Sequence, residues 1–288
     1  MKENIYPSNS SDDPLIQGFA LAPLEVVKLK INGVCLNSCC FCHFHNDRQI
    51  LSHYDVVRFF QALKREDYRL IVINGGEPTL HPEFLKISDF LRDHFKGRKK
   101  LQLGTNLRIF EKMNRKRHLL LQTMLVTYDR ISVGCDLEHR NIDILEYLAP
   151  VILANGLELS ITTISGYYDS SLLSRLEQMA RMQKVTLRIS PINHIGQGEP
   201  IRTVKTLCAL RRNALLINCD GKAYFCFEQE FAEPAFQLSE IEHLDLEGLV
   251  YNNIPMRPYN FCSYCLRYIP ESLATQGLSD NEVTLESS

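Results

Sequence analysis

The chain alternates between strand-like and helix-like segments from about residue 24 to about residue 192. Short apolar runs predict strands at residues 26–31, 70–73, 101–103, 131–133, 157–162 and 185–189. Repeated strand–helix units favour a parallel sheet with right-handed crossovers. Because a closed barrel of this kind has eight strands, six strands predict an α/β fold that is a partial (β/α)6 TIM-like barrel.

Helices are predicted between these strands, at residues 54–65, 82–95, 111–123, 142–154 and 171–182. Ser52 is a suitable N-cap for the first helix, and Pro82 suits the first turn of the second. Gly97 and Gly156 lie where helices should end. In parallel α/β folds functional side chains gather at the C-terminal ends of the strands, so the loops that follow the strands are the candidate site.

The pattern changes beyond the sixth strand. Residues 213–226 predict a β-hairpin with its turn at Asn218–Gly221, and residues 239–250 predict a short polar helix. The chain then divides into an N-terminal extension (1–23), the barrel (24–199), a small C-terminal hairpin-plus-helix module (200–271) and a tail expected to be disordered (272–288).

Ten cysteines stand out in a chain of 288 residues with a net charge of -2. The charge argues against a strongly basic nucleic-acid binder, and no apolar run is long enough for a membrane helix. The polar first 14 residues contain no apolar signal-peptide core. We therefore expect a cytoplasmic protein without a nucleic-acid or membrane partner, whose clustered thiols bind metal or do redox work.

The first cysteine group, Cys35, Cys39 and Cys42, follows directly after the first predicted strand. Cysteines this close together are typical ligands of an iron–sulfur cluster, which normally has four. Three thiolates leave one iron open, and an open position on a metal is where a substrate or cofactor binds. The alternative is a structural zinc site with His43 or His45 as the fourth ligand.

The Cys-x3-Cys-x2-Cys spacing, with Phe41 just before the last cysteine, resembles the cluster motif of the radical S-adenosylmethionine (SAM) superfamily. The resemblance implies that Cys35, Cys39 and Cys42 hold a [4Fe-4S] cluster that binds SAM, with Phe41 among the cofactor-binding residues. It implies reductive cleavage of SAM to a 5′-deoxyadenosyl radical, which takes a hydrogen atom from the substrate. It also implies an electron donor such as flavodoxin or ferredoxin. Cys40 does not fit the spacing and is not an expected ligand.

The residues Gly75, Gly76, Glu77 and Pro78 end the second predicted strand, where the superfamily carries its GGEP motif. Paired glycines allow the backbone to approach a ligand closely. Glu77 and nearby carbonyls can accept charge-assisted hydrogen bonds from the SAM ammonium group. Alone these four residues predict a turn, but behind the cysteine triplet they support the resemblance.

Weaker matches end the third and fourth strands. Thr105 and Asn106 stand where many members have Thr-Asn-Gly, and Leu107 replaces the glycine. Ser132 or Asp136 is expected to approach the SAM ribose or the substrate.

Two further matches have equally plain alternatives. Arg140 is a candidate for the SAM carboxylate, although most such arginines are solvated surface residues. Residues 189–191 and 196–198 resemble the region that packs on adenine, or else form an ordinary strand end and loop.

The second cysteine group lies beyond the barrel and consists of Cys208, Cys226, Cys262 and Cys265. Four thiolates are a complete ligand set for an iron–sulfur cluster or a zinc ion. The arrangement resembles the twitch module, a shortened SPASM extension, which implies a second, auxiliary [4Fe-4S] cluster. Zinc remains the alternative, because spacing does not separate the two.

Cys135 and Cys219 belong to neither set of expected ligands. Unligated cysteines are more often small buried residues than reactive ones. The alternative is that one of them, with Cys135 as the candidate catalytic residue, returns a hydrogen atom to a substrate radical, which would make the protein an epimerase.

A fully ligated auxiliary cluster has no open iron, so its simplest role is to accept an electron. Hydrogen abstraction followed by electron loss is a two-electron oxidation, and the four-cysteine arrangement is similar to the twitch region of 2-deoxy-scyllo-inosamine dehydrogenases. We therefore predict a radical SAM oxidoreductase with a small-molecule substrate. The alternatives are a maturase that crosslinks or epimerises a ribosomally made peptide, and a non-catalytic electron carrier or zinc-stapled binding protein. The GGEP motif argues against a carrier.

Overall fold

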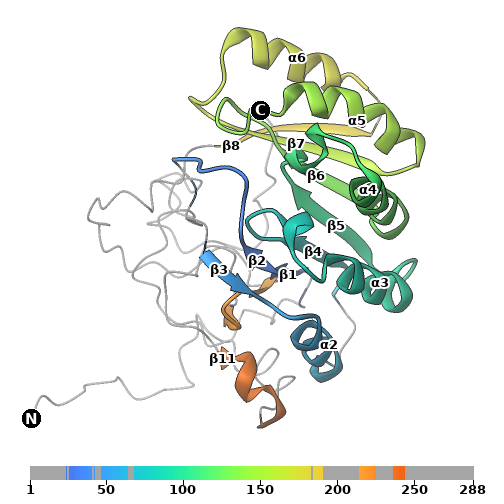
Figure 1. Cartoon of the computed structure of the whole chain (residues 1–288), viewed down its shortest axis with the longest axis vertical. Coiled ribbons are helices and arrows are strands. Elements are labelled where there is room, and N and C mark those ends of the chain that lie inside the picture. Colours follow the sequence, from blue (N-terminus) through green and yellow to red (C-terminus); the bar gives the residue numbers. More distant parts are fainter. Residues whose placement is uncertain are drawn as a thin grey trace, which may run out of the picture.

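The computed structural model describes residues 24, 26–40, 42, 47–63, 68–182, 184–190, 214–224 and 236–243. Nine strands form one sheet in the order β11-β10-β9-β1-β4-β5-β6-β7-β8 (Figure 1). The sheet is largely parallel and open, since β8 and β11 are its two edges. Among the described residues no helix is both long and apolar enough to cross a membrane.

The six strands of the expected partial barrel are all present. They are β1 (Val26–Lys30), β4 (Leu70–Asn74), β5 (Lys100–Thr105), β6 (Arg130–Gly134), β7 (Glu158–Ile164) and β8 (Val185–Ser190). Each pairs in parallel with the next, which confirms the predicted α/β fold and the predicted absence of closure.

The five predicted helices are also present, and they lie along one side of the sheet (Figure 1). They are α2 (His53–Ala62), α3 (Phe84–Phe95), α4 (Arg115–Thr127), α5 (Ile142–Ala154) and α6 (Ser170–Ala180). Ser52 caps α2 as expected, with its hydroxyl accepting from the Asp55 amide at 3.1 Å. Two predicted starts are too early, because Pro82 precedes α3 and Asn114 is the N-cap of α4.

The core lies between the sheet and the helices. Alternate strand residues such as Leu101, Leu103, Ile131 and Val133 are completely buried, and they belong to the same apolar cluster as Ile152 of α5. Each such side chain contributes about 1.5–3 kcal/mol by its removal from water. The helices therefore hold the sheet rigid, and the strand ends carry the site.

The predicted hairpin is confirmed within the described residues, but it is not a separate body. Strands β9 (Ala214–Ile217) and β10 (Lys222–Tyr224) pair antiparallel around a turn in which Gly221 has a φ of 79°. Strand β9 also pairs in parallel with β1. The hairpin therefore extends the barrel sheet across the boundary expected at residues 199 and 200.

Two short elements complete the described part beyond the hairpin. Strand β11 (Phe236–Gln237) pairs with β10, and a 3-10 helix follows at Leu238–His243, at the start of the short polar helix expected over residues 239–250. Residues 244–250 lie outside the described residues. The expected extension (1–23) and tail (272–288) lie outside the described residues, which begin at residue 24, the expected start of the barrel.

A second sheet, not expected from the sequence, consists of β2 (Asn32–Gly33) and β3 (Asp47–Ile50). It continues from β1, and the Leu51 amide donates to the Ile31 carbonyl at 2.8 Å just beyond it. The cysteine loop lies between these two strands.

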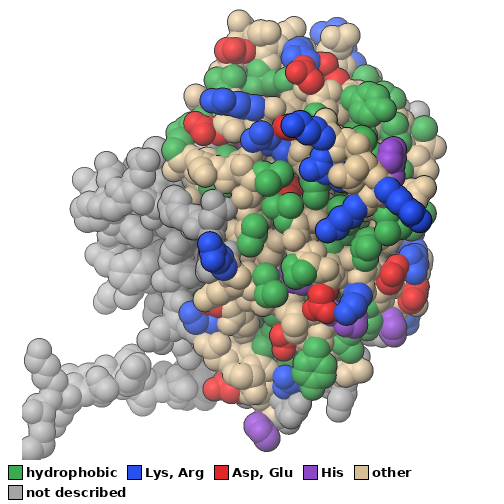
Figure 2. Space-filling view, viewed as in Figure 1, with side chains coloured by type: hydrophobic (Ala, Val, Ile, Leu, Met, Phe, Trp, Pro, Cys, Tyr) green, Lys and Arg blue, Asp and Glu red, His purple; other side chains and the backbone are tan. Residues whose placement is uncertain are grey.

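Acidic and basic side chains are interspersed over the described part of the face in Figure 2, as expected for a nearly neutral chain.

Candidate functional site

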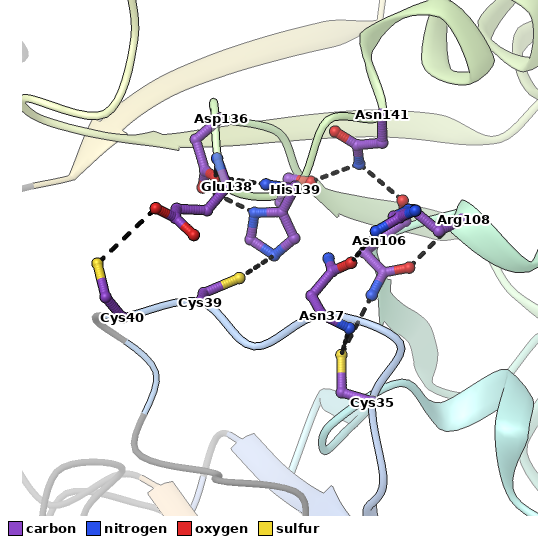
Figure 3. Close-up of polar contacts among 11 residues, drawn as sticks. Cys35, Asn37, Cys39, Cys40, Asn106, Arg108, Asp136, Glu138, His139 and Asn141 are labelled. Atoms are coloured by element: carbon purple, nitrogen blue, oxygen red, sulfur yellow. Dashed lines mark hydrogen bonds and ion pairs between the residues drawn. The ribbon is translucent and has the colours of Figure 1, made fainter.

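The first cysteine group lies on the loop between β2 and β3, at the C-terminal end of β1 (Figure 3). The Cys42 amide donates to the Cys39 carbonyl at 3.0 Å, which forms a tight turn. Cys39 is 5% exposed, whereas Cys35 and Cys42 are partly exposed. The expected position of the thiols, after the first strand and at the C-terminal edge of the sheet, is what the structure shows.

Backbone amides just after β4 hold this loop through hydrogen bonds. The Gly76 amide donates to the Asn32 carbonyl at 2.8 Å, and the Glu77 amide donates to the Val34 carbonyl at 2.7 Å. A Cβ at Gly75 would lie 2.3 Å from the Asn32 carbonyl oxygen, and a Cβ at Gly76 would lie 2.3 Å from that of Val34. The absence of side chains at Gly75 and Gly76 thus lets the backbone at the end of β4 approach the backbone of residues 32–34, which leads into the cysteine loop.

The carboxylate of Glu77 joins the ends of β4 and β5. It is completely buried and accepts from the Thr79 amide at 3.2 Å, the Thr105 hydroxyl at 2.8 Å and the Asn106 amide at 2.7 Å. Burial raises the pKa of this carboxyl group, while the hydrogen bonds from Thr79, Asn106 and Thr105 oppose the rise. Three of the predicted residues (Glu77, Thr105 and Asn106) therefore lie together, and Pro78 begins the 3-10 turn that Glu77 caps.

Asn106 connects this network to the cysteine loop. Its side-chain Nδ2 lies 3.4 Å from Cys35 Sγ, and the Asn37 amide lies at the same distance from that sulfur. The side chain of Asn141 donates to the Asn106 carbonyl at 2.6 Å and to the Gly134 carbonyl at 2.8 Å. The ends of β5 and β6 are thereby tied to the sulfur-bearing loop.

The end of β6 contributes a carboxylate–imidazole pair. Asp136 is 2% exposed, and its Oδ1 accepts from the amides of Glu138 and His139 at 3.0 and 2.9 Å. Its Oδ2 lies 2.7 Å from His139 Nδ1, and His139 Nε2 lies 3.9 Å from Cys39 Sγ (Figure 3). Asp136, which the sequence places near the SAM ribose or the substrate, also positions His139. His139 was not among the expected site residues, although the Asp-x-x-His spacing after a strand is a signal that points to it.

The chain resembles known proteins more clearly in structure than in sequence. No family model matches it. A probable GTP 3′,8-cyclase from Saccharolobus islandicus is 34% identical over 68 residues, which cover 23% of this chain and 22% of that protein. The match thus spans about a fifth of the length of the curated relatives.

Two solved structures share the fold over most of the chain. Streptococcus suis SuiB bound to S-adenosylmethionine has a TM-score of 0.59 at 15% identity, covering 81% of this chain and 67% of that one. The anSMEcpe enzyme with bound AdoMet and the Cp18Cys peptide has a TM-score of 0.55 at 14% identity, covering 81% of each chain. Both neighbours are radical SAM enzymes. The chain has the radical SAM fold.

Leu107 departs from the Thr-Asn-Gly pattern expected in the radical SAM fold, yet it keeps a glycine-like backbone with a φ of 60°. A left-handed conformation costs a non-glycine residue about 1–2 kcal/mol. The Leu107 side chain is completely buried, which contributes about 1.5–3 kcal/mol and offsets that strain. The substitution therefore preserves the geometry of the turn after β5.

The structure does not bring Cys135 to the site. It lies just beyond the end of β6 at Gly134, is completely buried and belongs to the same apolar cluster as Val133. Burial raises the pKa of its thiol to about 12. The expected role of Cys135 as a hydrogen donor has no support in this placement. Ser132, on the opposite face of β6, is partly buried, and Arg140 is exposed with a φ of 51°.

The donors around the cysteine loop fit an iron–sulfur cluster. Burial raises the pKa of the Cys39 thiol to about 12, and Asp136, Cys42 and Cys35 contribute to the rise, so the three thiols are close enough to influence one another. Asn37 is 7% exposed, and its Nδ2 has no hydrogen-bond partner among the described residues, while its Oδ1 accepts from Arg108 at 2.7 Å. Such an orphaned donor suits the sulfur atoms of a cluster.

Within the described ranges no three His, Cys, Asp or Glu side chains converge closely enough to hold a single metal ion. The remaining expected ligands and contacts (Phe41, Cys208, Cys226, Cys262 and Cys265), the zinc alternatives His43 and His45, and residues 191–198 lie outside the described residues.

Proposed function

We propose that this protein is a radical SAM enzyme in which Cys35, Cys39 and Cys42 hold a [4Fe-4S] cluster. The observation that carries the proposal is the anchoring of the cysteine loop by the Gly76 and Glu77 amides at the C-terminal edge of a radical SAM fold. When bound, the cluster supplies an electron that cleaves SAM to a 5′-deoxyadenosyl radical, which takes a hydrogen atom from the substrate.

The described residues have distinct roles in this proposal. Three thiolates leave one iron for the amino and carboxylate groups of SAM. Glu77 fixes the ends of β4 and β5, and Asn106 and Asn37 supply hydrogen bonds toward the sulfurs. Ser132, on the face of β6 opposite the helices, is the proposed contact for the SAM ribose or the substrate, and Arg140 is the proposed contact for the SAM carboxylate.

For the overall reaction we propose a two-electron oxidation. The substrate would lose a hydrogen atom to the 5′-carbon of the deoxyadenosyl group and then a proton to solvent. Cys208, Cys226, Cys262 and Cys265 would hold a second cluster, which would accept the remaining electron. This part rests on the sequence alone. The protein would receive the electron for SAM cleavage from flavodoxin or ferredoxin.

A peptide substrate is the second candidate. It is supported by the structural likeness to SuiB bound to the precursor peptide SuiA, which has a TM-score of 0.59 at 14% identity. The likeness to anSMEcpe with its bound peptide adds to it. Epimerisation leaves the oxidation state of the peptide unchanged, whereas a crosslink, like an alcohol oxidation, removes two hydrogen atoms. The mass of the product therefore identifies epimerisation, and the nature of the substrate separates a crosslinked peptide from an oxidised small molecule.

The experiment uses adjacent cysteines as matched variants. Wild type, Cys39→Ala and Cys40→Ala are reconstituted without oxygen and analysed for iron, sulfide and, after addition of dithionite and SAM, 5′-deoxyadenosine. We expect wild type and Cys40→Ala to form 5′-deoxyadenosine, and Cys39→Ala to lose about four irons and this activity. Formation of 5′-deoxyadenosine by Cys39→Ala would contradict the proposed ligand set.

A second variant, Cys226→Ala, tests the auxiliary cluster. Loss of about four of about eight irons would support it. Loss of one zinc, with iron unchanged, would replace the electron acceptor with a structural metal and remove the basis for oxidation.

A further inference from the structure

A group of basic side chains lies where the chain passes from β5 into α4. Residues 108–118 contain five lysines or arginines and one glutamate, in a chain whose net charge is -2. Lys112, Arg115 and Lys116 are exposed, and none of the three forms an ion pair with another described residue. We refer to these three side chains as the basic surface.

Two of these cations begin a helix. Arg115 and Lys116 lie in the first turn of α4, whose N-cap Asn114 accepts from the Arg117 amide at 3.0 Å, and this turn contains no acidic residue. The helix dipole already places positive potential at this end, so local stability favours Asp or Glu there rather than Lys or Arg. The Arg117 side chain donates to the Lys112 carbonyl, which holds Lys112 beside the start of the helix. The cations and the dipole therefore combine into one positive field directed at solvent.

The basic surface is connected to the cysteine loop. Arg108 begins the 3-10 turn that leads from β5 toward α4, and its Nη1 donates to Asn37 Oδ1 at 2.7 Å (Figure 3). The Asn37 amide in turn lies 3.4 Å from Cys35 Sγ. An ion pair with Glu111 at 2.7 Å holds the Arg108 side chain on its other side. Two hydrogen bonds thus join the segment that carries the basic surface to the sulfur of a proposed cluster ligand.

The proposed chemistry requires an electron from outside the chain. Electron transfer between proteins weakens steeply with distance, so the donor must dock near the cysteine loop. Such encounters use small interfaces, and opposite charges on the two proteins steer their association. Leu119 lies one turn beyond Arg115 on the same face of α4 and is 48% exposed, which places an apolar side chain beside the cations. A positive surface with an exposed apolar residue suits a protein partner that carries acidic side chains.

We propose that Lys112, Arg115 and Lys116 form the docking surface for the electron donor, and that this donor is a small acidic redox protein. The inference rests on the proposed function, in which the cluster must be reduced before SAM is cleaved. In each encounter the donor loses one electron and the cluster gains it, with no bond made or broken.

The test reverses the charge at the first turn of α4. Arg115→Glu/Lys116→Glu should fold as wild type does, because glutamates suit a helix N-terminus. The matched control is Arg181→Glu/Lys184→Glu, which reverses two exposed cations that precede β8 and thus lie at the N-terminal edge of the sheet, away from the cysteine loop. The probes are an acidic flavodoxin and an acidic ferredoxin. The measurements are the Kd of each probe for the full chain reconstituted without oxygen, and the rate at which each reduced probe reduces the cluster.

We expect the wild-type chain to bind at least one of the two donor proteins. Arg115→Glu/Lys116→Glu should raise the Kd for that donor, and lower the rate of cluster reduction by it, by about tenfold or more at low salt. The control variant should match wild type in both measurements. Dithionite is a small reductant that needs no docking surface, so it should reduce the cluster at the same rate in all three proteins.

The outcomes separate the two levels of the proposal. Absence of a cluster, or of SAM cleavage with dithionite, in wild type would refute the proposed function and this inference with it. With SAM cleavage intact, failure of both donors to bind wild type, an unchanged Kd in Arg115→Glu/Lys116→Glu, or equal losses in the two double variants would refute only the docking surface. Equally tight binding of a polyglutamate peptide to wild type, lost in Arg115→Glu/Lys116→Glu, would assign the surface to acidic peptides and overturn its role in electron delivery.

Discussion

Replacing Gly76 with alanine places a methyl group 2.3 Å from the carbonyl oxygen of Val34. Ordinary contact begins at about 3.4 Å, so the Val34 carbonyl must retreat by about 1 Å. This carbonyl accepts from the Glu77 amide, and Gly76 itself donates to the Asn32 carbonyl. Both hydrogen bonds link the GGEP segment to the loop that carries Cys35, so the retreat separates the two.

The magnitude follows from these contacts. Two hydrogen bonds contribute about 1 kcal/mol each, and overpacking adds about 1–3 kcal/mol. We therefore expect Gly76→Ala to lower the free energy of unfolding by about 3–5 kcal/mol, measured by urea denaturation followed by circular dichroism. Iron bound after reconstitution should fall as well, because the cysteine loop is displaced.

Gly104→Ala is the matched control in the neighbouring strand β5. There the added Cβ meets Asn74 Cβ at 3.2 Å, so this contact needs to open by only about 0.2 Å, against about 1 Å at Gly76. We expect a change below about 1 kcal/mol. An equal loss in the two variants, or a loss below about 1 kcal/mol in Gly76→Ala, would refute the reasoning that the glycines serve to hold the loop.

Two further predictions concern buried side chains. Cys135→Ala should lower the free energy of unfolding by about 1 kcal/mol, because it leaves a small cavity in the core, and SAM cleavage should be unchanged. Loss of 5′-deoxyadenosine formation without any loss of stability would contradict a purely structural role for this residue. Burial lowers the pKa of His81, whose Nδ1 accepts from the Glu83 amide at 3.0 Å and whose Nε2 lies 3.1 Å from the Leu51 carbonyl. Below about pH 6.5 the unfolded chain takes up a proton that the folded chain resists, so stability falls with acidity. In His81→Gln the free energy of unfolding, measured between pH 5 and pH 8, should decrease less steeply with decreasing pH than in wild type. Identical slopes in the two proteins would exclude this linkage.

The main sheet was predictable because its strands are buried on the helix side and bounded by clear helix signals. The same holds for the thiols and the GGEP segment, whose place at strand ends follows from the parallel topology. Helix starts were less predictable, since the residues before α3 and α4 favour helix formation while the N-cap of α4, Asn114, lies further along.

The contacts of the site were not predictable from the sequence. The sequence suggested a contact of Glu77 with SAM, but it gave no sign of the hydrogen bonds that its carboxylate accepts from Thr105 and Asn106 at the next strand end. Asp136 likewise serves the turn that carries His139. Such assignments depend on the position of loops from different strands, which local propensity does not encode. Cys135 is a similar case. It follows the end of a strand, and the sequence pattern did not determine whether its side chain enters the core or faces the site; in the structure it enters the core.

The pairing of β9 with β1 means that completion of the sheet depends on a contact between segments far apart in the sequence. Strand β1 lies between β4 and β9, and its register with β9 joins Val26 to Ala214 and Leu29 to Ile217. During synthesis the first strand emerges long before its second neighbour, so one row of its backbone groups stays unpaired until residue 217 has left the ribosome. A chain cut after β8 would leave that edge of β1 open, on the strand that leads into the cysteine loop. The strand that carries the thiol-bearing loop therefore gains its second neighbour only when a segment nearly 190 residues beyond Val26 has been made.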